Sequence, residues 1–378
     1  MNNLVLYRKY RPQSFAEIIG QEHVVQTLTN SISAKNISHA YLFSGPRGSG
    51  KTTIARIFAK AVNCEDPSSF EPCNKCNSCL EIMQSKAMDL IEIDAASHTG
   101  VDNVRELIDG IKFAPISSKY KIFIIDECHQ LSKSAFNALL KTLEEPPGHA
   151  VFILATTEVH KMIPTIISRC QRFDFKKLLV PEIIKKLEFI SKKENIKFED
   201  SALSLIALNS RGSFRDAESL LDECINFSGN ASLIKTEDIK ELLGIVEISQ
   251  ISRFVDLLLL KNAKEAVLFL NLMLDNGSDL QEFAKTLVFY FRQCLLLKLS
   301  SGLLNPQSSG LSAEEIETMK KQIAVLSEKE IQDLLRIFME AENKMKYSAI
   351  LQLPLELAVV DVVLSPSFLF AEQKEQHK

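Results

Sequence analysis

Apolar residues in the first half of the chain form short runs separated by longer stretches of helical periodicity. Four runs have the length and apolar content of buried strands: residues 40–44, 89–94, 121–125 and 150–154. Three stretches carry apolar residues at the spacing of a helix face: residues 52–62, 101–111 and 133–143. Strands that alternate with helices favour a parallel sheet with helices on both faces. Ligands of such sheets bind at the carboxyl ends of the strands.

The second half of the chain shows helical periodicity alone. Residues 181 to about 243 hold three helical patterns, among them 181–193 and 201–210. Strong apolar periodicity follows from Glu247 to about Ser365, as in 254–260 and 280–299. Breaks are expected at Gly277, Pro306 and Gly310. We therefore predict a helical bundle, followed after Pro366 by a polar, disordered tail.

A glycine-rich segment connects the first predicted strand to the first predicted helix. It reads Gly45-Pro-Arg-Gly-Ser-Gly-Lys51-Thr52, the full phosphate-binding pattern in the strand–loop–helix context that the pattern requires. Glycines let successive amides point inward, and the start of the helix adds its dipole to the same anion site. We expect Lys51 to reach the β- and γ-phosphates of a nucleotide and the Thr52 hydroxyl to ligate Mg²⁺. The predicted nucleotide-binding residues of this segment are Gly45, Pro46, Arg47, Gly48, Ser49, Gly50, Lys51, Thr52 and Thr53.

Four cysteines follow that helix with the spacing Cys-x8-Cys-x2-Cys-x2-Cys, at Cys64, Cys73, Cys76 and Cys79. The residues between them are mostly turn formers, so the segment cannot fold by apolar burial. Four thiolates on Zn²⁺ would fold it, and such an all-sulfur site would be structural. Disulfides and an iron–sulfur cluster are the alternatives that the spacing leaves open.

Length and composition bound these predictions. The 378 residues and the hydrophobic content of 46% suit two to three globular domains. The net charge of −4 excludes a generally basic protein, so contact with nucleic acid would need a local patch or backbone amides. No apolar run approaches a membrane span, and the N-terminal apolar stretch is too short for a signal peptide, so we expect a cytoplasmic protein.

Two acids end the third predicted strand. Asp126 is placed to hold Mg²⁺, and Glu127 to orient or deprotonate the attacking water. A solvated acidic turn is the alternative. The tetrad Asp126-Glu127-Cys128-His129 also resembles a helicase box, but no other helicase motif accompanies it.

Residues 150–154, which we take as the final strand of the sheet, lead into Ala155-Thr156-Thr157-Glu158. We favour Thr157 over Thr156 as the hydroxyl that contacts the attacking water or the γ-phosphate. Arg169 follows on a predicted turn after the sheet. An arginine there is either an ordinary surface residue or a finger for the nucleotide of a neighbouring subunit.

In combination, these motifs resemble the gamma/tau subunits of the bacterial DNA polymerase III clamp loader, a family of AAA+ ATPases. The matching blocks cover residues 4 to about 243. They include Tyr7-Arg-Lys-Tyr-Arg-Pro12, Gly20-Gln-Glu-His23, the phosphate loop, the four cysteines, Ile91-Glu-Ile-Asp-Ala-Ala-Ser97, Ile125-Asp-Glu-Cys-His129, residues 136–147, Leu154-Ala-Thr-Thr157, Ser168-Arg-Cys170 and Gly212-Ser-Phe-Arg-Asp-Ala217.

The resemblance implies roles that spacing alone leaves open. Arg169 would act in trans on the ATP of the adjacent subunit, Thr157 would be the first sensor, and Arg215 would be the second sensor in cis. Without the resemblance, Arg215 is better described as a surface charge at a helix start, because Gly212 and Ser213 form a capping pattern. The family also implies an adenine pocket formed by Tyr10, Arg11, Pro12 and Ile18, with Ile19 beside them.

The resemblance further implies an α/β AAA+ module followed by all-α lid and collar domains. The expected bounds are 1–178 for the ATPase core with a zinc module at about 64–79, 179–243 for the lid, 244–368 for the oligomerising collar and 369–378 for the tail.

The implied activity is that of an ATP-hydrolysing motor subunit of the replicative clamp loader. It would be a DNA-stimulated ATPase within the DNA polymerase III holoenzyme, a DNA-directed DNA polymerase. ATP binding would open the sliding clamp and engage primer–template DNA, and hydrolysis would release both. The implied cofactors are ATP, Mg²⁺ and Zn²⁺. The implied partners are delta-type and delta-prime-type subunits, further copies of this chain, the clamp and DNA, with no membrane.

Direct DNA contacts are weakly indicated. Family members often carry basic residues after Ala95-Ala-Ser97, whereas this chain has His98 and Gly100. Lys133 is a weak candidate for a DNA contact, since lysines on a solvent-facing helix side are mostly hydrated. Two rival functions fit less well: a branch-migration helicase would lack the cysteine module, and a non-hydrolysing scaffold would be expected to lose Lys51 or Thr52.

Overall fold

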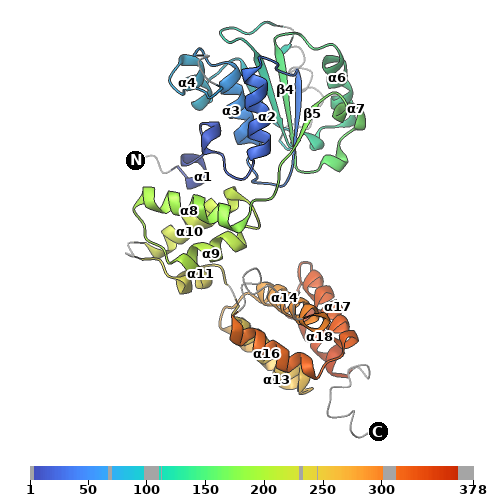
Figure 1. Ribbon diagram of the computed structural model, residues 1–378. Helices are drawn as coiled ribbons and strands as arrows, with labels where there is room; N and C mark the ends of the chain where they lie inside the picture. The colour runs from blue at the N-terminus through green and yellow to red at the C-terminus, as the bar shows by residue number, and fades with distance from the viewer. Residues whose placement is uncertain are drawn as a thin grey trace. The chain divides into compact units, whose positions relative to one another are not determined.

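The computed structural model describes residues 4–66, 70–97, 110–111, 113–229, 233–244, 246–300 and 312–364 (Figure 1). The chain divides into two compact units, residues 1–239 and 240–378. The predicted breaks at Pro306 and Gly310, the tail, and all but the end of the predicted helix 101–111 lie outside the described residues.

The first unit is built around a parallel sheet. Its described strands are β1 (Ala40–Ser44), β2 (Leu90–Asp94), β3 (Lys121–Asp126), β4 (Ala150–Thr156) and β5 (Gln171–Asp174). They run in the order β2-β3-β4-β1-β5, and every pairing is parallel. The four predicted strands are therefore confirmed.

β5 corrects the prediction that β4 is the final strand. It pairs with β1 at the edge of the sheet, and Arg169 precedes it instead of following the sheet. This strand has four residues, of which only Phe173 is buried, so its apolar signal is weak. The alternation of Phe173 and Phe175 with polar residues could have revealed it.

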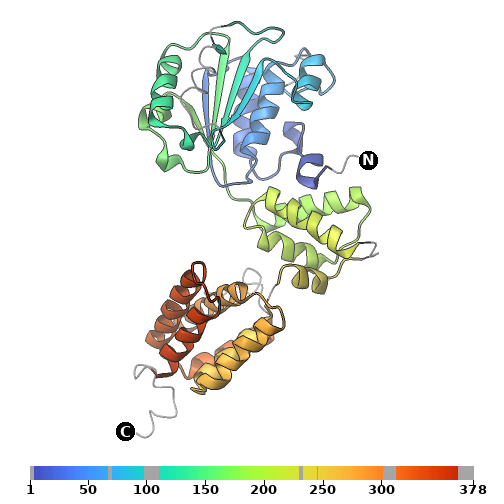
Figure 2. The same ribbon diagram turned by 180° about the vertical axis from the view of Figure 1, so that it is seen from behind.

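Helices cover both faces of the sheet (Figures 1 and 2). One face packs on α2 (Glu22–Ser33) and α3 (Lys51–Val62), and the other on α6 (Lys133–Glu144) and α7 (Pro164–Ile167). Side chains of β4 alternate between the two layers, because successive strand residues point to opposite faces. Val151 and Ile153 join the α3 side, whereas Phe152 and Leu154 join the α6 side.

Short elements surround this core. They are α1 (Leu6–Lys9), α4 (Asn77–Met83) and the 3₁₀ turns Phe15–Glu17, Cys128–Gln130 and Val159–Lys161. The predicted small helical domain follows as α8 (Val180–Glu194), α9 (Asp200–Asn209), α10 (Phe214–Ser228) and α11 (Thr236–Leu242). Ser213 caps α10, since its hydroxyl accepts a hydrogen bond from the Asp216 N–H at 3.2 Å.

The second unit is helical, as predicted. Its described helices are α12 (Ile248–Leu259), α13 (Ala263–Asp275), α14 (Leu280–Leu299), α16 (Ala313–Ala324), α17 (Glu328–Met345) and α18 (Leu353–Leu364). Phe291 stacks on Phe338 with ring centroids 5.5 Å apart, and Phe254 meets Phe283 edge to face at 5.2 Å. Gly277 separates α13 from α14 with a φ of 78°. Through the described part of the chain, each helix is too short or too polar to cross a bilayer.

Candidate functional site

The glycine-rich loop lies at the carboxyl end of β1 and runs into α3. Gly45 has a φ of 152°, and a Cβ there would lie 2.5 Å from the carbonyl oxygen of Phe175. Gly48 has a φ of 72°, and a Cβ there would lie 1.8 Å from Oγ of Ser213. The N–H of Phe214 also donates to the Gly48 carbonyl at 3.3 Å. Glycine is therefore required where the loop meets β5 and the start of α10.

Lys51 is the first residue of α3 and is buried beneath this loop. Its Nζ donates to the carbonyl oxygens of Gly45 and Pro46, at 2.8 Å in both cases. Burial lowers the pKa of Lys51, and the carboxylates of Glu127 and Asp126 oppose that shift. The ammonium thus lies on the inner side of the phosphate loop, with both acids close enough to influence it.

Thr52 and Asp126 meet at the end of β3. The Thr52 hydroxyl donates to Oδ2 of Asp126 at 2.6 Å, and the Glu127 N–H donates to Oδ1 at 2.9 Å. A hydroxyl and a carboxylate at contact distance are hard oxygen donors of the kind that Mg²⁺ prefers. These two residues therefore fit the magnesium ligands that the sequence predicts.

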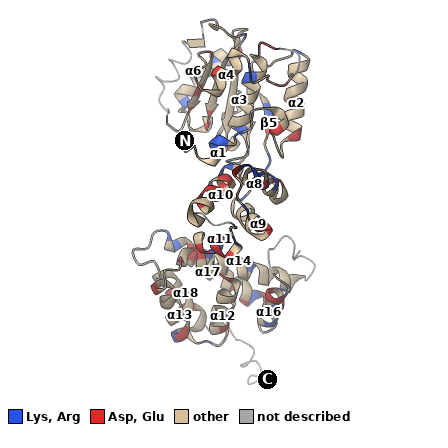
Figure 3. Cartoon of the chain, turned by 90° about the vertical axis from the view of Figure 1, so that its left-hand side faces the viewer, with Lys and Arg blue, Asp and Glu red and all other residues tan. Residues whose placement is uncertain are grey.

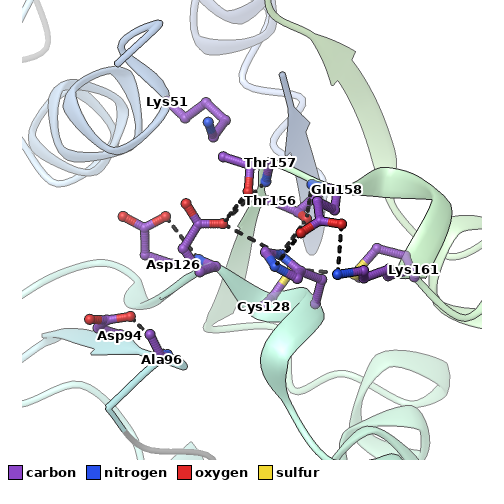
Figure 4. Close-up of polar contacts among 12 residues, drawn as sticks. Lys51, Asp94, Ala96, Asp126, Cys128, Thr156, Thr157, Glu158 and Lys161 are labelled. Carbon is purple, nitrogen blue, oxygen red and sulfur yellow. Dashed lines mark hydrogen bonds and ion pairs between the residues drawn. The ribbon is translucent and has the colours of Figure 1, made fainter. Parts of the chain in front are cut away.

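Glu127 is hydrogen-bonded to Thr157, and Figure 4 draws Thr157 together with Lys51 and Asp126. Oε2 of Glu127 accepts hydrogen bonds from the Thr157 hydroxyl at 2.7 Å and from the Thr157 N–H at 3.2 Å. Thr156 is fully buried, and its hydroxyl lies 3.0 Å from Nδ1 of His129. Glu127 has a left-handed backbone, with φ 45° and ψ 41°, which costs a non-glycine residue ~1–3 kcal/mol.

A cavity lies over the loop, and both carboxylates and apolar side chains line it. Arg11, Pro12, Ile18 and Ile19, which the resemblance assigns to the adenine pocket, line it together with Arg215. Its other lining residues are Tyr7, Glu17, Arg47, Gly48, Ser49, Gly50, Lys51, Thr52, Thr53, Ile54, Asp126, Glu127, Lys186, Phe214 and Glu218.

Tyr10 does not line this cavity, which corrects the predicted adenine pocket. Its hydroxyl donates to Glu194 at 2.6 Å, and its ring packs edge to face against Phe189 of α8. Tyr7 lines the cavity instead, with the Arg215 guanidinium 5.1 Å from the centre of its ring.

The sequence did not predict Lys186 and Glu218 in the cavity. They come from α8 and α10, and Nζ of Lys186 lies 4.0 Å from Oε1 of Glu218 and donates to the Tyr10 carbonyl at 2.9 Å. Burial raises the pKa of Glu218 to about 7, and Lys186 and Arg11 oppose the shift. Burial likewise lowers the pKa of Lys186. Residues so distant in sequence give no local signal that they will meet.

Arg169 and Lys133 lie away from the cavity. The Arg169 guanidinium donates to the Thr165 carbonyl at 2.8 Å and pairs with Glu144 at 2.5 Å. Lys133 is exposed at the start of α6. The structure therefore does not bring Arg169 to the phosphate loop of its own chain.

The four predicted cysteines converge. The sulfur atoms of Cys64, Cys73, Cys76 and Cys79 all lie within 4.8 Å of one another. The N–H groups of Lys75 and Cys76 bond the Cys73 sulfur at 3.5 and 3.3 Å, and they lower the pKa of Cys73 to about 6. Because a metal binds the thiolate form, this donor set fits Zn²⁺.

Three family models match consecutive parts of the chain. They are described as DNA polymerase III, delta subunit, over residues 20–179; DNA polymerase III clamp loader subunit, ATPase lid domain, over 182–230; and DNA polymerase III subunits gamma and tau domain III, over 234–375.

Individual relatives match nearly the whole chain. DNA polymerase III subunit tau of Bacillus subtilis is 45% identical over 96% of this chain and 63% of its own length. Subunit tau of Escherichia coli is 41% identical over 86% of this chain and 49% of its own. Subunit gamma of Buchnera aphidicola from Acyrthosiphon pisum is 38% identical over 96% of this chain and 99% of its own. The chain thus spans 49% to 63% of the length of these two tau subunits, but nearly all of that gamma subunit.

A solved structure also aligns with the chain. The Holliday junction branch migration motor RuvB of Thermotoga maritima matches 65% of this chain and 78% of its own, at 21% identity and a TM-score of 0.48.

Proposed function

Because the chain belongs to the gamma/tau family of DNA polymerase III clamp loader subunits, we propose that it is an ATP-hydrolysing motor subunit of the replicative clamp loader. Its first unit is an AAA+ module: a five-stranded parallel sheet over the described residues, with flanking helices and a helical lid. The supporting observation is that a phosphate loop, a hydroxyl–carboxylate pair and a second carboxylate face one cavity.

The proposed chemistry assigns each of these groups a role. Lys51 and the loop amides bind the β- and γ-phosphates of ATP, and Thr52 and Asp126 hold Mg²⁺. Bound Mg²⁺ supplies positive charge to the phosphate oxygens. Glu127 orients and deprotonates the attacking water, and Thr157 positions the Glu127 carboxylate through the two hydrogen bonds described above.

The lid helices can respond to the bound nucleotide, because they contact the phosphate loop. Gly48 of the loop contacts Ser213 and Phe214 at the start of α10, and Arg215 lies one residue further along. We propose that Arg215 contacts the phosphates in cis as the second sensor. A movement of the loop then shifts α10, because Gly48 and Ser213 are packed too closely to move independently.

The hydrolytic site is completed by a neighbouring subunit in this proposal. Arg169 is anchored by Thr165 and Glu144, outside the cavity of its own chain. An arginine finger supplied in trans accelerates phosphoryl transfer by about 10³–10⁵ in related enzymes. We therefore assign Arg169 to the nucleotide of the adjacent subunit.

The remaining parts follow the family. We propose an ATPase core of 1–178, a lid of 179–243 and a collar of 244–368 through which delta-type, delta-prime-type and further copies of this chain assemble. The assembled loader opens the sliding clamp on ATP binding and releases clamp and primer–template DNA on hydrolysis. The cysteine cluster holds a structural Zn²⁺.

Lys51→Ala tests the catalytic assignment. In a reconstituted loader we expect the variant to lose ATP binding and DNA-stimulated hydrolysis at its own sites, because the phosphates lose their cation. The measurements are nucleotide titration and phosphate release. The exposed Lys133→Ala serves as control for nucleotide binding. If Lys51→Ala subunits hydrolysed ATP at the wild-type rate, the catalytic assignment would be refuted.

Mixing variants tests the trans assignment. Arg169→Ala subunits and Lys51→Ala subunits are each expected to be inactive where neighbouring copies hydrolyse ATP. In a mixed loader, an intact phosphate loop meets an intact Arg169 at some interfaces, so hydrolysis should partly recover. No recovery at any mixing ratio would count against a finger in trans.

A further inference from the structure

A second cavity, of about 570 Å³, lies beside the proposed nucleotide site. It is enclosed by α1, the segment that follows α1, the outer side of α3, and the residues at the end of α4. Tyr7, Arg11 and Arg215 line both cavities and so form part of the wall between them. Tyr7, Arg8 and Arg11 belong to the block at residues 7–12 that carries the family resemblance, but the sequence did not indicate a second cavity there.

Five of the fourteen residues that line the second cavity are cationic. Arg8, Arg11, Arg56, Lys60 and Arg215 all line it, whereas its described lining contains no Asp or Glu. This concentration is local, because the whole chain carries a net charge of −4. Figure 3 shows that α1, which carries Arg8, is a basic element of this unit.

Two of these five cations, Lys60 and Arg56, have polar partners outside the aromatic ring of Tyr7. Lys60 donates to the Gln13 carbonyl at 2.7 Å and to Oδ1 of Asn74 at 2.8 Å. Arg56 pairs through Nε with Glu92 at 2.7 Å, and over the residues that the structure describes its terminal nitrogens make no hydrogen bond. Lys60 is thus satisfied within the wall, and Arg56 is only partly neutralised.

Arg11 is the cation in this cavity whose charge is least compensated by neighbouring groups. Its guanidinium is partly buried, yet it donates no hydrogen bond and forms no ion pair within the part of the chain that the structure describes. Burial lowers the pKa of Arg11, and Arg56, Arg215 and Arg8 add to the effect while Glu92 opposes it. A cation that is withdrawn from water beside other cations is costly unless an anion joins it.

Arg8 and Arg215 both contact the aromatic ring of Tyr7. Their guanidinium carbons lie 5.8 and 5.1 Å from the centre of the Tyr7 ring. The ring attracts both cations, and hydrogen bonds from Arg8 and Arg215 lower the pKa of Tyr7.

We propose that the second cavity binds a small phosphate-bearing anion, separate from the nucleotide held by the phosphate loop. Guanidinium groups match phosphate oxygens in pairs, and Arg8, Arg11 and Arg56 provide three such groups around one space. The volume suits a ligand of nucleotide size or smaller. Because Arg11 and Arg215 line both cavities, an anion in the second one alters the affinity of the first for nucleotide.

The test measures pyrophosphate binding by calorimetry in the full chain carrying Lys51→Ala, which weakens the phosphate loop as a competing anion site. We expect binding that becomes weaker as salt is added. Arg8→Gln together with Arg56→Gln should weaken it about tenfold or more, because both substitutions remove charge-assisted donors. Arg172→Gln, at an exposed arginine on β5, is the matched control and should change nothing.

The outcomes that overturn the proposal are distinct from those that overturn the ATPase assignment. Pyrophosphate binding that is absent, or unaffected by the double variant, refutes the second site whatever happens to ATP. Arg8→Gln alone, at an exposed side chain, keeps the test valid if the double variant does not fold. If binding of a short DNA duplex, but not of pyrophosphate, depends on these arginines, the anion is a nucleic acid backbone and the small-anion proposal is wrong.

Discussion

Gly48 lies where the phosphate loop touches the lid. We expect Gly48→Ala to lower nucleotide affinity at least about tenfold, because its methyl group would overlap Ser213 and its left-handed backbone costs an L-residue ~1–2 kcal/mol. Titration with a fluorescent ATP analogue measures the change. Gly148→Ala is the control, since a Cβ at Gly148 meets nothing within 4 Å. Equal affinities for the two variants would show that the loop and the lid are not coupled at this point.

The raised pKa of Glu218 leads us to expect that the stability of the fold depends on pH. Its pKa is raised to about 7 in the fold, above the ordinary value of 4.5, so between these pH values the folded protein binds more protons than the unfolded chain. The stability contribution of the protonated carboxyl is present below pH ~4.5 and is lost as the pH rises through about 7. Thermal unfolding should therefore show wild type losing stability relative to Glu218→Gln between pH 5 and pH 8.

The matched control for this prediction is Glu188→Gln on α8, at a glutamate whose side chain is 45% exposed. It should leave the pH dependence of wild type unchanged. Parallel pH profiles for wild type and Glu218→Gln would contradict the burial argument.

Some individual site residues could be predicted from the sequence, whereas others could not. The residues of the phosphate loop, Thr52, Asp126 and Glu127 could be placed from sequence, because a local pattern fixes the backbone on which they sit. Tyr7 and Tyr10 could not be distinguished, since they lie about one helical turn apart. The contact of Tyr10 with Glu194 and Phe189 decides which ring faces the cavity, and these partners lie more than 170 residues away.

At the scale of elements, the cysteine segment lies between α3 and β2, and we propose that Zn²⁺ cross-links it. Cys76→Ser should abolish zinc binding and make residues 64–79 sensitive to proteases, because the turn-rich segment has little apolar surface to bury. Nucleotide affinity should change less than about twofold. Zinc content, limited proteolysis and nucleotide titration measure the three effects.

Cys170→Ser, at a half-buried cysteine outside the cluster, should retain zinc. Full zinc retention by Cys76→Ser would show that Cys76 is not a ligand.

The helices and strands themselves were predictable where periodicity was strong. The predicted bounds of β1 and α14 coincide with those of the structure, since their apolar patterns are continuous from end to end. β5 was missed because it is a short edge strand in which only Phe173 is buried, so its sequence lacks a run of apolar residues. An element is therefore easier to predict from sequence when a larger fraction of its residues is buried in the core.

At the scale of the whole molecule, the two units have separate hydrophobic cores. Phe338→Ala should destabilise the second unit by ~3–5 kcal/mol, because this fully buried ring contacts Phe254 and Phe291. Nucleotide binding by the first unit should be unaffected. Calorimetry of the full chain and nucleotide titration measure the two effects, and Phe289→Ala, at a partly exposed ring, is the control. A matching loss of nucleotide affinity would show that the units fold as one.

The left-handed backbone of Glu127 has a consequence for selection. Glycine or asparagine tolerates that conformation more easily than glutamate does. Under the proposed mechanism, in which Glu127 deprotonates the attacking water, laboratory evolution that screens for heat resistance alone would favour replacing Glu127, and the resulting proteins would bind ATP but hydrolyse it slowly. Selection for ATP hydrolysis would be needed to keep a glutamate at this position.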